Sequence, residues 1–323
     1  MVLESIIGEK NIKKHPVFIF FITLLICAGS IFFADMMFPT HSSILSVAFI
    51  TIGLVPLIFN ILSDEEADEE VHHKHFSTFF ARHFNIIMLY VWVFVGIIVA
   101  FSIYYAVAPP TDRPVLFAEQ IKSFCAISGF GSCTGGVPLS VSGMAASFGF
   151  DACLSKSSAI SSCAWFIFSN NFEVLILTVI LSLLYGVGAI FMIAWNASIL
   201  GVFFGEMLAI GNLSKGLGLF QGLLLGHGPP ELFGYVFGAL AGAILSAMVA
   251  RGDYSSHHSE IIIKDVLFLS GLAIFSVAYG AATEALGILG MTELYFLMGF
   301  LYLVLIILAV FFYGQKRQIT LGL

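Results

Sequence analysis

Long apolar runs, most of them about 20 residues in length, dominate the hydrophobic pattern of this chain. Seven can cross a bilayer as helices: 17–37, 44–62, 86–107, 174–195, 232–250, 266–282 and 294–312. A helix needs about 20 apolar residues to cross roughly 30 Å of hydrocarbon. A membrane β-barrel would instead alternate apolar and polar positions in segments of about ten residues. The pattern therefore predicts an all-α, polytopic bundle of transmembrane helices.

Two shorter apolar segments, 197–210 and 217–225, lie between the fourth and fifth runs. At about 1.5 Å per residue, the first reaches about 21 Å and the second about 14 Å. We expect the first to cross the membrane obliquely and the second to form a short re-entrant segment. This gives seven to eight crossings, and eight would place both termini on the same side.

Lysine and arginine placement predicts the orientation, because cytoplasmic loops carry an excess of both residues. With eight crossings, nine of these residues fall on the side of the termini and four fall on the other. The nine are Lys10, Lys13, Lys14, Lys74, Arg82, Arg251, Lys264, Lys316 and Arg317, and the four are Arg113, Lys122, Lys156 and Lys215. We therefore expect a multi-pass protein of the cell membrane with cytoplasmic N- and C-termini.

The composition supports a membrane protein and argues against a nucleic-acid partner. Hydrophobic residues make up 59% of the chain and charged residues 10%, whereas about 25% of a soluble domain is charged. The net charge is -7, and the acidic run "SDEEADEE" contributes much of it. Histidines follow this run and recur in a later loop: His72, His73, His75, His83, His257 and His258. They could ligate a transition metal, but their spacing is irregular, so we favour solvated loops.

Four of the five cysteines lie in a Gly- and Ser-rich segment without a clear span: Cys125, Cys133, Cys153 and Cys163. Only Cys27 falls in a predicted membrane helix. An even set of cysteines on the oxidising side of a membrane favours disulfide bonds. The spacing matches no common zinc pattern, although buried free thiols remain an alternative.

The stretch "GLLLGHGPPELFGYVFGALAGAIL", residues 222–245, places polar residues inside an apolar run. A proline is favoured in the first turn of a helix, so Gly228 is the expected N-cap, with Pro229 at the first helical position. Glu231 then falls at the third position, where a carboxylate can bond the cap N–H. Further along, small residues recur every fourth position: Gly234, Gly238, Gly242 and Ser246. Such a stripe allows close helix packing in lipid.

Capping does not explain His227, nor the other polar residues of neighbouring apolar segments: Asn170, Asn171, Asn196 and Glu284. An isolated charge in hydrocarbon costs roughly 2.5–3.5 kcal/mol on insertion scales. Partnering inside the protein offsets that cost. We therefore predict that Asn170, Asn171, Asn196, His227, Glu231 and Glu284 form a polar network between membrane helices.

These polar residues resemble the pattern of the stage II sporulation protein M family of membrane proteins. The resemblance rests on "SNNFEVL", "WNASILG", "GHGPPELFGYVFGALAGA" and "AATEAL", and it covers about residues 168–286. The chain departs from the pattern at Ala197, Pro229, Pro230 and Gly234. The family does not explain the three N-terminal spans, the acidic loop or the cysteine-rich segment. The resemblance implies a membrane scaffold that acts with cell-wall-remodelling partners.

We expect four regions: an N-terminal membrane region (1–114), an extracytoplasmic Cys-rich segment (115–168), a family-like core (169–286) and a C-terminal helix with a basic tail (287–323). The favoured function is a scaffold or assembly protein with a membrane or envelope protein partner and no cofactor. A transporter or channel using the same polar site is the alternative. An intramembrane metal-dependent hydrolase is a third hypothesis. We expect no metal, because one histidine and two carboxylates make a thin zinc site, and we assign no catalytic residue.

Overall fold

The computed structural model describes residues 17–71, 79–128, 160–186, 188–209, 211, 218, 221–252 and 257–321. Eight long helices dominate these ranges: α3 (Val17–Met37), α4 (Ser42–Val71), α5 (Phe79–Val107), α9 (Ile160–Tyr185), α10 (Ala189–Ala209), α12 (Gly228–Arg251), α13 (His257–Ile288) and α14 (Thr292–Leu321). Three short helices accompany them: η1 (Pro39–His41), α6 (Arg113–Leu116) and α7 (Ala118–Ser128). The described part of the chain holds no strand, which confirms the predicted all-α bundle.

Seven of the long helices are apolar enough over a sufficient length to cross a membrane. They include the predicted spans Val17–Met37 and Ile86–Val107, with identical bounds. The apolar part of α14, Thr292–Leu308, is somewhat shorter than the other seven. Counting α14, the described residues contain eight long helices.

The structure divides one of the predicted spans. The run 174–195 is not a single helix, because α9 ends at Tyr185 and α10 begins at Ala189. Between them Gly186 has a φ of 67°, a left-handed conformation that glycine adopts readily and that commonly ends helices. The segment 197–210 was expected to be a short oblique crossing, but residues 197–209 are the second half of the 21-residue helix α10.

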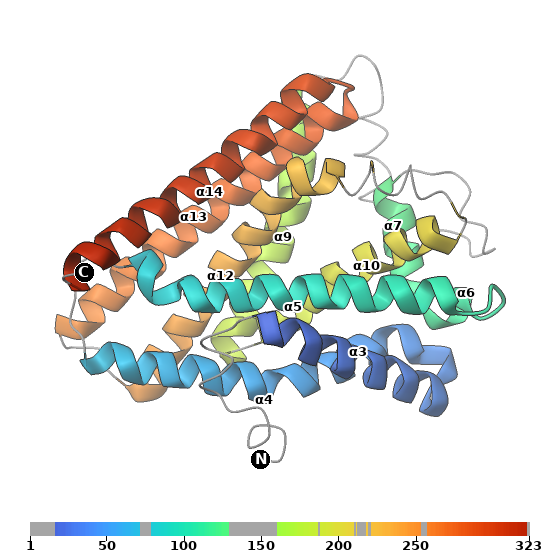
Figure 1. Ribbon diagram of the computed structural model, residues 1–323, viewed down its shortest axis with the longest axis horizontal. Helices are drawn as coiled ribbons and strands as arrows, with labels where there is room; N and C mark the ends of the chain where they lie inside the picture. The colour runs from blue at the N-terminus through green and yellow to red at the C-terminus, as the bar shows by residue number, and fades with distance from the viewer. Residues whose placement is uncertain are drawn as a thin grey trace.

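The long helices pack in two groups, which Figure 1 shows as the blue-to-green helices α3, α4 and α5 and the orange-to-red helices α12, α13 and α14. Helix α10 packs against α5, and α9 packs against α12 and α13. Close contact between α5 and α10 depends on Gly201 and Gly205, where an added Cβ would lie 2.9 Å from a carbonyl oxygen of α5. The Ser102 hydroxyl also donates a hydrogen bond to the Gly201 carbonyl at 3.0 Å.

The small-residue stripe of α12 is divided between two neighbouring helices. Gly238 and Gly242 face α9, and an added Cβ at Gly242 would lie 2.6 Å from the Val179 carbonyl oxygen. Gly234 faces α13, where its Cβ would lie 2.6 Å from Val277. Ser246, one turn further, is only partly buried. Neighbours in the same chain thus cover the three glycines of the stripe.

We expect Gly242→Ala to destabilise the bundle, because the added methyl group meets the backbone of α9. Overpacking of this kind costs about 1–3 kcal/mol. Gly271→Ala is the matched control, since Gly271 is an exposed helical glycine with open space around its Cβ position. Thermal unfolding in detergent should show a lower melting temperature for Gly242→Ala and an equal or higher one for Gly271→Ala. Equal melting temperatures for the two variants would contradict the described packing.

Candidate intramembrane site

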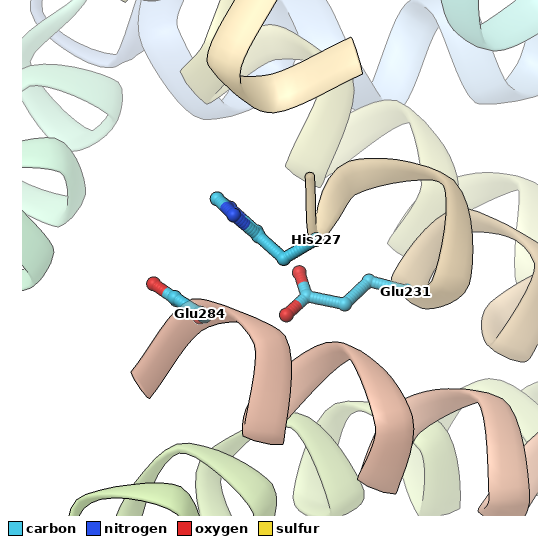
Figure 2. A group of neighbouring side chains, drawn as sticks. All are labelled: His227, Glu231 and Glu284. Atoms are coloured by element: carbon cyan, nitrogen blue, oxygen red, sulfur yellow. The ribbon is translucent and has the colours of Figure 1, made fainter. Parts of the chain in front are cut away.

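Three ionisable side chains meet between α12 and α13. His227 precedes the first residue of α12, Glu231 lies in the first turn of α12, and Glu284 lies one turn before the end of α13. One ligand atom from each residue lies within 4.8 Å of the others, and all three residues are partly buried. Figure 2 shows the three side chains gathered in one space between the two helices.

Helix α12 begins at Gly228, with His227 as the N-cap residue and proline in the first turn. The helix therefore begins one residue earlier than predicted, and its N-cap residue is His227 rather than Gly228. The backbone N–H of Glu231 donates to the His227 carbonyl at 3.3 Å. The Glu231 carboxylate instead accepts a hydrogen bond of 2.8 Å from the Asn171 side-chain amide. Its observed side-chain partner is therefore on α9 rather than at the cap of its own helix.

A glycine on α13 makes room for the Glu231 side chain. An added Cβ at Gly280 would lie only 2.7 Å from the Glu231 Cγ atom. The absence of a side chain at this position therefore lets the carboxylate pass along α13 toward Glu284. Together with the Asn171 hydrogen bond, this packing fixes the direction of Glu231.

His227 is oriented by Tyr295, a residue near the start of α14. The His227 Nδ1 atom lies 3.0 Å from the Tyr295 hydroxyl oxygen, and that hydroxyl donates to the Gly222 carbonyl at 2.6 Å. Because a phenol has only one proton to donate, His227 Nδ1 must be the donor in its contact with Tyr295. A neutral imidazole then carries its lone pair on Nε2, which is the usual way in which an outer partner prepares a ligating histidine.

Glycines form a slot for the Tyr295 ring. An added Cβ at Gly226 would overlap the ring, and one at Gly287 would lie 2.9 Å from it. At Gly299 an added Cβ would overlap the backbone of Leu225, so α14 packs directly against the segment that precedes His227. The sequence analysis missed Tyr295, whose only signal is a lone tyrosine near the start of the last apolar run.

The three ionisable residues border a cavity of about 490 Å³. Residues of α5, α9, α10, α12, α13 and α14 line it, so the cavity lies between the two groups of helices. Its polar lining comprises His227, Glu231 and Glu284 together with Asn170, Asn171, Asn196 and Tyr235, and most of the remainder is apolar. The cavity lies within the size range of ligand sites, about 300–1,000 Å³.

The predicted network residues thus all reach one cavity, but in different ways. Asn171 bonds directly to Glu231. Asn196 lines the cavity while its side-chain amide donates to the Met192 carbonyl of its own helix at 2.8 Å. Asn170 also lines the cavity but is largely exposed. Within the described residues, neither Asn170 nor Asn196 has a hydrogen bond to His227, Glu231 or Glu284.

The other candidate residues lie away from this site or outside the described side chains. Cys27 is a buried free thiol. Cys163 takes part in a disulfide bond, but the side chains of Cys125, Cys133 and Cys153 are outside the described part, so the two bridges remain a prediction. The histidine-rich loop residues, His72, His73, His75, His83, His257 and His258, have side chains outside the described part as well.

The three ligand groups fit a divalent cation. Ligands that bind one zinc ion at 2.0–2.2 Å lie no more than about 4 Å apart, so the cluster is close to the size of a coordination sphere. Imidazole and carboxylate together suit zinc and related divalent metals. A dication also neutralises two carboxylates, which removes the electrostatic cost of placing them together in apolar surroundings. This geometry gives the metal hypothesis more support than the residue types alone.

Fold and site together define a multi-pass membrane protein with a polar cavity between its helices. The chain belongs to the stage II sporulation protein M family, whose model matches residues 91–287, more than half of the sequence. The match begins within α5 and includes the cysteine-rich segment, so the family region is longer than the sequence motifs indicated. Searches of curated proteins and of solved structures found no match.

Proposed function

We propose that this protein is an intramembrane hydrolase that uses a divalent cation held by His227, Glu231 and Glu284. The observation that carries the proposal is the meeting of their ligand atoms within 4.8 Å beside a cavity. Two carboxylates so close in apolar surroundings repel unless a cation or a proton lies between them. The contact of His227 Nδ1 with the Tyr295 hydroxyl favours the cation, because it leaves the lone pair of a neutral imidazole on Nε2, and a ligating nitrogen must keep its lone pair.

The residues around the cluster support a catalytic rather than a purely structural site. Three protein ligands leave coordination positions open, as in catalytic zinc sites. A cation here would supply Lewis acidity, the chemistry with which such sites polarise carbonyl groups and water. Asn171 holds Glu231 through a hydrogen bond, and Tyr295 holds His227, so both ligands have the outer partners that metal sites require. The adjoining cavity gives a substrate access to the cluster.

Oxygen-18 labelling tests the proposed hydrolysis without knowledge of the substrate. Membranes from cells that lack the protein are incubated in H₂¹⁸O with purified wild-type protein or with Glu284→Gln. We expect new ¹⁸O-labelled carboxyl groups with wild type alone, and loss of this labelling after chelation. Equal labelling with both proteins, while wild type still binds the cation, would reject hydrolysis. Cation flux in proteoliposomes would then support the transporter hypothesis.

A scaffold role, which the sequence favoured, is the second candidate. The hydrogen bond between Asn171 and Glu231 supports it, because this bond ties α9 to α12 and helps to set their register. A membrane or envelope protein partner belongs to this candidate. In that case, crosslinking in native membranes should capture one partner in stoichiometric amount, and chelation should change neither the crosslinking nor the melting temperature.

We also propose that the protein resides in the cell membrane with both termini in the cytoplasm. The number of long helices and the excess of lysine and arginine on one side support this orientation. A cysteine introduced by Ala67→Cys should react with a membrane-impermeant maleimide only after the cells are opened. One introduced by Thr111→Cys should react in intact cells. Labelling of both from outside would contradict the orientation.

A further inference from the structure

We propose that the substrate is an apolar peptide segment, and that the side chain of Asn196 binds one of its peptide groups. This inference rests on the proposed hydrolase function and names the substrate class for the same cavity. It draws on three observations: the charges of the cavity lining, the free hydrogen-bonding capacity of Asn196, and the apolar remainder of the lining.

The charges of the lining indicate an uncharged substrate. Among the described lining residues, Glu231 and Glu284 are the only acidic side chains, and there is no lysine or arginine. A divalent cation held by the two carboxylates balances their negative charge. The site then has no net positive charge with which to attract an anionic group. Proteins that bind phosphate groups supply arginine, lysine or a helix N-terminus for them. Among the described lining residues, the start of α12 is the only such feature, and Glu231 already occupies its first turn. Phosphate esters are therefore poor candidates.

Asn196 offers both a donor and an acceptor to a bound molecule. The atom near the Met192 carbonyl must be the amide nitrogen, because two oxygen acceptors would repel. This bond uses one N–H and holds the side chain in place. The second N–H and the side-chain oxygen have no hydrogen-bond partner among the described residues. A peptide group carries a matching acceptor and donor, whereas an ester lacks the donor.

The remaining lining suits apolar side chains. Phe94 and Ile98 of α5, Phe166 of α9, Ile199 of α10 and Leu232 of α12 contribute to it. Burial of an apolar side chain against such a surface contributes about 1.5–3 kcal/mol. The cavity also lies between helices that are long and apolar enough to cross a membrane.

The reaction is ordinary peptide hydrolysis. The oxygen of water forms a bond with the peptide carbonyl carbon, and the carbon–nitrogen bond breaks. The leaving nitrogen takes one proton from the water, so the products are a carboxylic acid and an amine. One new C-terminus therefore carries oxygen from water for every bond broken, and no oxidant or other co-reactant is needed.

Two substrate mixtures in nanodiscs test the inference. One contains apolar peptides from a digested membrane fraction in ether-linked lipid, which has no hydrolysable ester. The other contains diacyl phosphatidylcholine without peptide. In H₂¹⁸O with added Zn²⁺, we expect labelled peptide C-termini from the first and no labelled fatty acid from the second. Asn196→Leu should raise the KM for peptide about tenfold, as expected for a lost hydrogen bond, with little change in kcat or in Zn²⁺ affinity.

The outcomes separate this inference from the proposed function. Labelled fatty acid without labelled peptide would overturn the peptide inference and leave the hydrolase standing. No product from either mixture would also overturn the inference, and the labelling of native membranes described above would then decide the hydrolase separately. An unchanged KM in Asn196→Leu would show that Asn196 does not bind the substrate.

Discussion

Glu231→Gln should abolish tight cation binding and, with it, cation-dependent hydrolysis. The carboxylate is one of the three ligand groups that the described residues contribute to the cluster, and an amide is a neutral and weaker ligand for a divalent metal. Loss of an outer partner alone typically weakens metal affinity 10–100-fold, so we expect a larger loss here. Wild type should be stabilised by Zn²⁺ by about 2.7 kcal/mol at a free concentration of a hundred times Kd. The variant should show no such stabilisation.

Glu173→Gln is the control for this change. Glu173 lies exposed on α9, close in sequence to Asn171, and it does not line the cavity. Melting curves with and without Zn²⁺, together with Zn²⁺ titrations, should show wild-type behaviour for this variant. If Glu231→Gln kept the Zn²⁺-induced rise in melting temperature, the carboxylate would not be a ligand.

Tyr295→Phe should weaken cation binding about 10–100-fold, the usual effect of removing an outer partner. The change keeps the ring in its glycine slot but removes the hydroxyl that accepts from His227 and donates to Gly222. Without that hydroxyl, a neutral His227 can carry its proton on Nε2 instead of Nδ1. A protonated Nε2 has no lone pair with which to bind a cation. The expected readout is a higher Kd for Zn²⁺ in titrations.

Tyr302→Phe provides the matched comparison on the same helix. The Tyr302 hydroxyl forms a buried hydrogen bond of 2.8 Å with Ser276, so this variant also loses a phenolic hydrogen bond. It should lower the melting temperature without changing Zn²⁺ affinity. Equal Zn²⁺ affinities for Tyr295→Phe and Tyr302→Phe would show that Tyr295 has only a structural role.

Most of the helical architecture could be predicted from the lengths of the apolar runs. The break between α9 and α10 could not, because Tyr185, Gly186 and Gly188 lie in a continuous apolar run and hydropathy does not register backbone conformation. Gly186, just after the end of α9, has a positive φ. The prediction therefore placed one helix across the turn and shortened the next.

The candidate site could also be predicted only in part from the sequence. His227, Glu231 and Glu284 stood out because ionisable residues are costly in hydrocarbon. The capping geometry proposed for Glu231 was a local inference, and local spacing could not reveal that Asn171, on another helix, would bond its carboxylate. The position of Tyr295 near a helix start did not distinguish it, since tyrosines are common at membrane interfaces. Its contact with His227 exists only because glycines allow α14 to approach.

The central claim is that His227, Glu231 and Glu284 hold one cation, and native mass spectrometry after Zn²⁺ loading tests it most directly. The mass of the intact chain should increase by one Zn²⁺ in wild type and in Glu173→Gln. Glu284→Gln and His227→Ala should gain none under the same conditions. No bound ion in wild type, or one retained in both Glu284→Gln and His227→Ala, would contradict the claim.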